Sequence, residues 1–182
     1  YETVWSHKDH GKSRAALECP DHPPGFRWVH ESIGSNWRLT ELQAAIGRLQ
    51  LRKLPEWLAR RQANAAQLND RLAETPGLRR TLPPPHIGHA YYKYYVFVRP
   101  EELKPDWSRD RVLHELNAAG APALSGGCPE IYQEKAFSPE LRPASRLPVA
   151  QQLGETSLMF PVHPTLRTED LDFWAEALNK IM

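Results

Sequence analysis

The sequence predicts an α+β fold in which helices cover one side of a small sheet. Three observations support this prediction. A long helical segment occupies residues 40–75, a run of aromatic and β-branched residues follows at 91–98, and short strand-like and helix-like segments alternate after it. The sequence shows no internal repeat and no linker polar enough to separate two independent domains.

The 182 residues have an ordinary globular composition, with 41% hydrophobic and 25% charged residues. The 23 Lys and Arg nearly balance the 22 Asp and Glu, and a net charge of +1 argues against a nucleic-acid partner. No apolar run approaches the roughly 20 residues of a membrane span, so we expect no membrane partner. Cys19 and Cys128 are too few for a disulfide framework, which favours a cytoplasmic protein.

The first residues contain neither a Met nor the apolar core of a signal peptide. We therefore expect a segment of a larger protein, in which Tyr1, Val4 and Trp5 form the end of a strand or the start of a helix. Gly and Pro interrupt any periodicity over residues 6–35, which predicts a loop.

The long helical segment opens with a capping box, in which the side chains of Thr40 and Gln43 each bind the other residue's backbone N–H. Pro55 is expected to kink this helix or to begin a second one. Apolar residues follow the cap at helical spacing: Leu42, Ile46 and Leu49.

An apolar stripe continues along the second half of the segment. Its members are Leu54, Leu58, Ala65, Leu68 and Leu72. Arg60, Gln67 and Arg71 are expected on the solvated side, and Arg61 packs its stem in the stripe with its charged head in water. We expect this face to pack on another helix or a sheet. In the isolated chain, Leu58, Ala65 and Leu72 are a candidate exposed patch that would cause self-association or marginal stability.

The remaining elements follow from capping residues and patterning. They are a strand at 91–98, a helix at 108–119 between Ser108 and Gly120, a short strand at 121–124, a turn or short helix at 129–137, a helical turn at 148–153 ended by Gly154, a strand at 156–162 and a final helix capped by Thr168. The final helix places four apolar residues on one face: Leu171, Trp174, Leu178 and Ile181.

Common catalytic motifs are missing: the sequence has no Walker loop, no dinucleotide-binding glycine turn, no H-E-x-x-H and no G-x-S-x-G. Four candidate zinc ligands lie near the N-terminus: His7, His10, Cys19 and His22. Since the paired C-x-x-C half-site of many zinc sites is absent, a polar loop with local hydrogen bonds is the competing interpretation. Base stacking by residues 91–95 with phosphate contacts from Arg79 and Arg80 is a weaker hypothesis.

The loop before the capped helix has the properties of an anion site. Gly34 provides a hinge, and Asn36 and Arg38 follow it just ahead of the helix. A carboxamide can donate to a phosphate, a guanidinium binds carboxylate or phosphate, and the helix dipole favours negative charge. The alternative is a turn residue followed by a surface ion-pair partner.

Residues 34–47, GSNWRLTELQAAIG, resemble the G-x-N-x-R-[ML]-T-E-x-Q-A-A-I-G motif of the DegT/DnrJ/StrS-type nucleotide-sugar aminotransferases. Residues 8–12, KDHGK, resemble the R-D-H-G-K segment of the same family. Three later segments, 127–137, 147–150 and 160–164, are similar to further family patterns and fall in the same order.

The resemblance implies a fold-type I enzyme that uses pyridoxal 5′-phosphate, of which this chain is the C-terminal part. It assigns residues 1–39 to the tail of the large domain and the interface loop, 40–75 to long linking helices and 76–182 to a small α+β domain. The family's Schiff-base lysine lies upstream of the segment at 8–12, so this chain holds no catalytic lysine, and neither Lys8 nor Lys12 is assigned that role.

The resemblance also implies site residues. Asn36 matches the asparagine that reaches across a homodimer interface to the partner's cofactor phosphate, and Arg38 matches the arginine beside it. Tyr132 and Cys128 fall in the substrate-side segment and are expected to contact the sugar. Gly127 and Cys128 replace the His-Tyr that many members have there, which indicates a different pocket.

The expected reaction is transfer of an amino group from glutamate to a nucleotide-linked keto sugar, as in polysaccharide biosynthesis, with no metal ion. Two alternatives stay open. A few relatives replace the Schiff-base lysine by histidine and dehydrate the sugar. The other alternative is a non-enzymatic module that binds zinc or a partner through residues 7–22.

Overall fold

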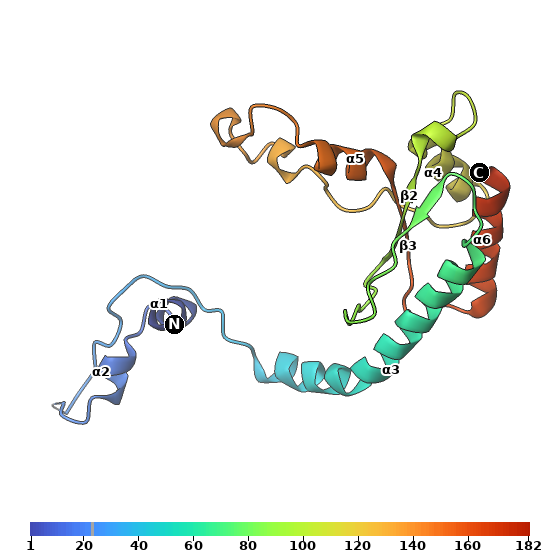
Figure 1. Cartoon of the computed structure of the whole chain (residues 1–182). Helices are drawn as coiled ribbons and strands as arrows, with labels where there is room; N and C mark the ends of the chain where they lie inside the picture. Colours follow the sequence, from blue (N-terminus) through green and yellow to red (C-terminus); the bar gives the residue numbers. More distant parts are fainter. Residues whose placement is uncertain (23) are drawn as a thin grey trace. The chain divides into compact units, whose positions relative to one another are not determined.

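The computed structural model describes residues 1–22 and 24–182. The chain forms two compact units, residues 1–53 and residues 54–182 (Figure 1). Helix α3, Glu41–Arg71, contributes residues to both units. Within the described residues, no helix combines the length and the apolar character needed to cross a membrane.

The first unit contains two short helices, one beginning in the predicted strand or helix segment and one inside the predicted loop at 6–35. These are α1, Glu2–Lys8, and α2, Arg14–Glu18. The start-of-helix alternative for the first residues is therefore right, and the loop prediction is wrong over residues 14–18. The sequence does contain a signal for α2, because the Ser13 side chain caps it by accepting a hydrogen bond from the Ala16 N–H at 3.2 Å.

Helix α3 begins with the predicted capping box. The Gln43 N–H donates to the Thr40 hydroxyl at 3.3 Å, and the Thr40 N–H donates to Gln43 Oε1 at 3.1 Å. The helix continues through Pro55, which therefore does not begin a second helix.

The second unit is built on an antiparallel sheet ordered β1-β2-β3, with β1 at Leu78–Arg80, β2 at Tyr94–Val98 and β3 at Ser157–Phe160. Val96 pairs with Leu158, and Tyr94 pairs with Phe160. Because side chains alternate along a strand, these four residues share one face, and all four are buried in the core. The predicted α+β class with a small sheet is confirmed.

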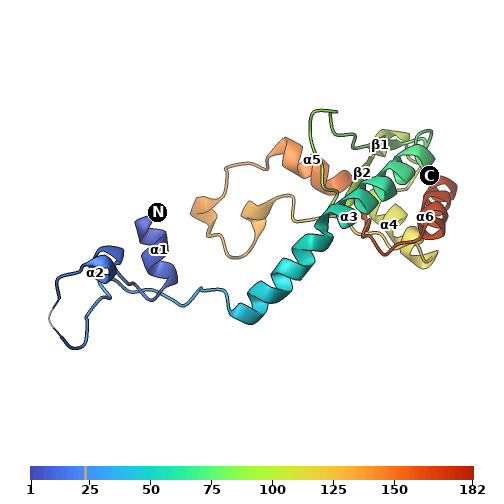
Figure 2. The same ribbon diagram turned by 90° about the horizontal axis from the view of Figure 1, so that it is seen from below.

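Helices bury this face of the sheet. Helix α4, Arg109–Ala118, packs against α6, Thr168–Ile181, and both join the core with the second half of α3 (Figure 2). Helix α5, Pro148–Thr156, contacts β2. Short 3-10 turns lie at Pro100–Glu102, Ile131–Gln133 and Pro139–Leu141.

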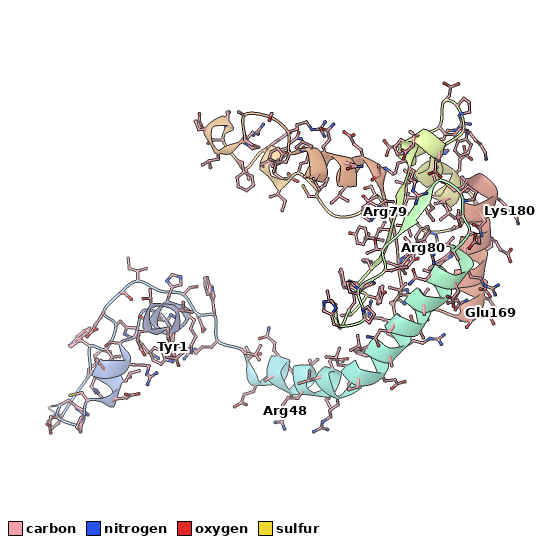
Figure 3. The ribbon with its side chains drawn as sticks, viewed as in Figure 1. Tyr1, Arg48, Arg79, Arg80, Glu169 and Lys180 are labelled. Carbon is pink, nitrogen blue, oxygen red and sulfur yellow. The ribbon has the colours of Figure 1, made fainter. Side chains whose placement is uncertain are left out.

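Several predicted strands are shorter than expected. β2 begins only at Tyr94, because Tyr91 has a φ of 44° that an extended strand does not allow. The predicted strand at 121–124 is reduced to one bridge between Leu124 and Met159. Strand β1 was not predicted, and its three residues include Arg79 and Arg80 (Figure 3).

Two predicted helix ends are also wrong. Gly154 lies inside α5 and does not end it. Thr168 is the first residue of α6, and Arg167 is its N-cap, with the Arg167 N–H donating to the Asp170 carboxylate at 3.1 Å. The first turn of α6 carries Glu169 and its last turn carries Lys180, so both charges favour the helix dipole (Figure 3).

Arg60 and Arg71 are exposed on α3 as predicted, and Gln67 is half-buried, but their head groups also bond to residues in and just before α6. Arg60 donates to the Leu166 carbonyl at 3.0 Å, and Gln67 and Arg71 both donate to Asp172 Oδ1 at 2.8 Å. Arg61, whose charged head was expected to reach water, is half-buried. Its guanidinium donates to the backbone carbonyls of residues 91 and 92.

The prediction that the apolar stripe packs on other elements is confirmed, and the candidate exposed patch is wrong, since Ala65, Leu68 and Leu72 are fully buried in the core. The large apolar residues that α3 exposes precede them: Leu42, Ile46, Leu49, Leu51 and Leu54.

Candidate functional site

Two segments of the first unit form a small antiparallel pair. Asp9 pairs with Asn36, and Lys12 pairs with His30. The Trp37 N–H donates to the Lys8 carbonyl at 2.9 Å, and the His10 N–H donates to the Ser35 carbonyl at 3.1 Å. The pairing brings the family-like segment at 8–12 against the loop that carries Asn36 and Arg38.

Two glycines make this close approach feasible. Gly11 has a φ of 84°, and a Cβ there would lie 1.6 Å from the Ser32 carbonyl oxygen. A Cβ on Gly34 would lie 2.3 Å from the Gly11 backbone nitrogen. Any side chain at either position would separate the two segments.

Asp9, Arg38 and Asn36 form one polar network at this pairing. The Asp9 carboxylate is buried, and its Oδ1 lies 3.2 Å from NH1 of Arg38 and 3.3 Å from Nζ of Lys12. The opposite edge of the same guanidinium donates from Nε to Asn36 Oδ1 at 3.1 Å. The Arg38 backbone N–H makes a longer contact with the same oxygen, at 3.4 Å.

The charges around Asp9 keep it ionised. Burial raises the pKa of Asp9, but the positive charges of Lys12 and Arg38 beside it outweigh burial and hold this pKa below its usual value. The carboxylate therefore remains available to Arg38 throughout the neutral pH range.

The network leaves one group of Asn36 available. Its carbonyl oxygen accepts from Arg38, whereas its Nδ2 donates to no group within the described part of the chain. At the nearby helix end, Thr40 caps the Gln43 N–H. A phosphate accepts hydrogen bonds only, so the donor edge of Asn36 fits such a group.

The second unit holds Cys128 and Tyr132, next to a charged cluster. The Tyr132 hydroxyl donates to Glu130, which is buried, and accepts from the Leu147 N–H at 2.9 Å. Arg146 donates to both carboxylate oxygens of Glu130, one of them at 3.0 Å from Nε. These bonds join the segment at 127–137 to the start of α5.

The ion pair between Glu130 and Arg146 shifts the pKa of both side chains. Hydrogen bonds from Arg146 and then from Tyr132 lower the pKa of Glu130 to about 2. The hydrogen bond to Glu130 raises the pKa of the Arg146 guanidinium. Cys128 is exposed, and a hydrogen bond with Glu134, followed by desolvation, raises the pKa of its thiol. The thiol is therefore protonated at neutral pH.

The structure thus brings Asn36 and Arg38 together in the first unit, and Cys128 and Tyr132 in one segment of the second. Sequence reasoning did not single out Asp9, Glu130 or Arg146. Asp9 belongs to the family-like KDHGK segment at 8–12, but no sequence pattern predicts that it contacts Arg38, which lies 29 residues later.

The candidate zinc ligands and the two arginines of β1 have other contacts. The His7 ring packs edge-on against Trp37, and the Cys19 thiol donates to the Asp21 carbonyl at 3.4 Å. Over residues 1–22 and 24–182, no three His, Cys, Asp or Glu side chains are grouped to hold a metal ion. Arg80 donates to the Asn69 carbonyl at 2.7 Å, and Arg79 stacks on Phe97.

Comparison with known sequences defines the class of protein. The profile of the DegT/DnrJ/EryC1/StrS aminotransferase family matches residues 12–179. The chain therefore belongs to this family, as the motif at 34–47 predicts.

Particular relatives give finer similarity. The chain is 34% identical over 146 residues to the erythromycin biosynthesis sensory transduction protein EryC1 of Saccharopolyspora erythraea, covering 80% of this chain and 38% of that protein. It is 29% identical over 164 residues to the GDP-perosamine synthase of Caulobacter vibrioides, covering 87% of this chain and 42% of that protein. The chain thus spans about two fifths of the length of these relatives.

A solved structure is similar over nearly the whole chain. The aminotransferase from Psychrobacter cryohalolentis has a TM-score of 0.87 and 47% identity, covering 99% of this chain and 48% of that chain. DesV of S. venezuelae has a TM-score of 0.74 and 26% identity, covering 92% of this chain and 42% of that chain.

Proposed function

We propose that this chain is the C-terminal part of an enzyme that transfers an amino group from glutamate to a nucleotide-linked keto sugar, using pyridoxal 5′-phosphate. The observation that carries the proposal is the donor edge of Asn36, which Arg38 leaves unoccupied inside a family motif. Membership of an aminotransferase family supports the reaction class. Relatives named as a dTDP-sugar transaminase and a GDP-perosamine synthase support a nucleotide-linked sugar as the substrate class.

In the proposed enzyme, residues 1–39 complete the large domain and carry the interface loop. Residues 40–75 link it to a small α+β domain at 76–182. The continuous core that joins the second half of α3 to the sheet, α4 and α6 supports a linking role for this helix.

The proposed role of Asn36 is to donate from Nδ2 to the phosphate of a cofactor held by the partner subunit of a homodimer. Arg38 keeps the carbonyl oxygen of Asn36 turned away from that phosphate. When bound, the cofactor supplies the electron sink that lets a proton leave the carbon bearing the amino group. The lysine that binds the cofactor lies in the segment upstream of this chain.

Cys128 and Tyr132 are proposed to line the sugar pocket. The Tyr132 proton is committed to Glu130, so this residue contributes its ring and a rigid loop. Cys128 is exposed, and because its thiol proton is shared with Glu134, its sulfur offers a weak acceptor to the sugar.

The test is an assay of the complete protein with pyridoxal phosphate, glutamate, and nucleotide-linked 3-keto or 4-keto sugars. We expect an amino sugar and 2-oxoglutarate to form in equal amounts, and only when the cofactor is present. A product that has lost water without gaining nitrogen would replace the proposal with a sugar dehydratase. Stoichiometric zinc together with no turnover would favour a binding module instead.

A further inference from the structure

The Arg38 guanidinium contacts Asp9 on one side and Asn36 on the other. On one side NH1 lies 3.2 Å from the Asp9 carboxylate, and on the other Nε donates to Asn36 at 3.1 Å. Asp9 is buried and backbone-paired with Asn36, whereas the Arg38 side chain is about half exposed. Of the three, Asp9 is therefore the member that the fold fixes most firmly.

We propose that Asp9 is a positioning residue that fixes, through Arg38, which edge of the Asn36 carboxamide faces the cofactor phosphate. This inference rests on the proposed function, since it takes the phosphate as the group that Asn36 contacts. The two edges of a carboxamide have nearly the same shape but opposite hydrogen-bonding character. The Nδ2 edge attracts a phosphate, and the Oδ1 edge repels it.

The choice between the two edges requires a donor on the oxygen. The terminal torsion of Asn is broad, so an unrestrained carboxamide turns readily. Arg38 Nε supplies that donor only while Asp9 holds the guanidinium in place. Without Asp9, Asn36 keeps only the longer contact from the Arg38 backbone N–H at 3.4 Å. Lys12 also pairs with Asp9, but it donates to Asp9 alone among these residues.

Asp9→Asn tests the inference because it removes the charge and keeps the shape of the side chain. The first measurement is NMR of the 182-residue chain without cofactor, following the Arg38 Nε–H and the Asn36 side-chain amide. We expect Asp9→Asn to speed exchange of the Arg38 Nε–H about tenfold and to shift the Asn36 amide signals. Asp9→Glu restores the charge and should recover most of the wild-type pattern. The exposed Asp21→Asn is the matched control and should change neither signal.

The second measurement is the dissociation constant of pyridoxal phosphate in the complete protein. We expect Asp9→Asn to raise this constant about tenfold, with circular dichroism used to check folding. Arg38→Lys provides an independent variant if Asp9→Asn fails to fold. It keeps a positive charge for Asp9, but a lysine paired with Asp9 has no second edge for Asn36, so we expect a similar loss of affinity.

Unchanged Arg38 and Asn36 NMR signals in a folded Asp9→Asn chain would overturn the inference, whatever the dissociation constant of pyridoxal phosphate. Altered signals with an unchanged dissociation constant would overturn it as well, because the orientation would then have no effect on the cofactor. A wild-type protein that does not bind pyridoxal phosphate would instead refute the proposed function, and the NMR arm would still decide whether Asp9 positions Asn36.

Discussion

The close contact between α5 and Pro129 requires a glycine at position 154. A Cβ at this helical position would lie 2.4 Å from Cγ of Pro129, and the rigid proline ring cannot turn away. The glycine therefore brings α5 against the segment that carries Cys128 and Tyr132. The sequence predicts a helix end at Gly154 because glycine commonly ends helices, and a contact with the distant Pro129 cannot be predicted from neighbouring residues.

We predict that Gly154→Ala destabilises the second unit by about 1–3 kcal/mol, since the overpacked contact forces the backbone apart. Gly47→Ala is the matched control, because it is also helical and a Cβ there meets nothing within 4 Å. That change should stabilise α3 by about 0.5–1 kcal/mol. Urea unfolding measures both, and equal effects would contradict the packing argument.

The pairing of Glu130 with Arg146 predicts a pH dependence of stability. The pKa of Glu130 is about 2 in the folded protein, below its ordinary value of 4.5. A lowered folded pKa contributes stability that is fully present above about pH 4.5 and disappears as the pH falls toward 2. We expect the urea midpoint of the wild type to fall across this window.

Glu130→Gln should lower the urea midpoint at pH 7 and flatten its change between pH 4.5 and 2. Glu155→Gln serves as the control, because Glu155 pairs with Arg146 from an exposed position and makes no bond to Tyr132. Its pH profile should match that of the wild type. A Glu130→Gln profile as steep as the wild-type one would contradict the assignment.

Local residue chemistry was predictable where the partners are close in sequence. The capping box of Thr40 and Gln43 is confirmed because its members are three residues apart. The Asp9 network was not predictable, because it depends on a pairing that only the folded chain creates. The roles of Asn36, Arg38, Cys128 and Tyr132 stay predictions.

At the scale of elements, α3 combines two environments in one helix. Its second half carries Leu68, which is 1% exposed and packs in the core, whereas Leu54 on the same helix is 49% exposed. We predict that Leu68→Ala costs about 2–5 kcal/mol, because it leaves a cavity between α3 and the sheet.

Leu54→Ala is the control for this prediction and should cost less than about 0.5 kcal/mol, because the side chain is half exposed already. Urea unfolding of the second unit reports both changes. A Leu68→Ala cost no larger than that of Leu54→Ala would show that α3 does not belong to the core.

Element type was predictable from sequence where the pattern was long. The apolar face of α6 is confirmed, with Leu171 and Leu178 fully buried. Strand β1 has only three residues, two of them arginine, and it exists because Leu78 and Arg80 pair with β2. The exposed position of Arg71 on α3 was predictable because arginine is usually exposed, but its partner Asp172 on α6 was not.

At the scale of the whole molecule, the first half of α3 exposes a row of apolar residues. Among them Leu42, Ile46 and Leu49 keep about half or more of their surface exposed. Such a surface is typical of an interface, so we expect the isolated chain to self-associate. Sedimentation velocity should show a mass that rises with concentration, and Ile46→Glu should reduce it. A wild-type chain that stays monomeric at high concentration would contradict this.

The central claim is that Asn36 completes a cofactor site in the partner subunit, and mixing two inactive variants tests it most directly. One variant of the complete protein carries Asn36→Asp, and the other lacks the proposed cofactor-binding lysine. In a mixed dimer, a site formed in trans combines the intact lysine of one subunit with the intact Asn36 of the other.

If half of the randomly mixed dimers are hybrids and each has one working site of two, about a quarter of the wild-type activity should return. If Asn36 served only its own subunit, both sites of every hybrid would be defective, and mixing would recover no activity. Recovery of about a quarter is the result we predict, and no recovery from verified hybrid dimers would contradict the account.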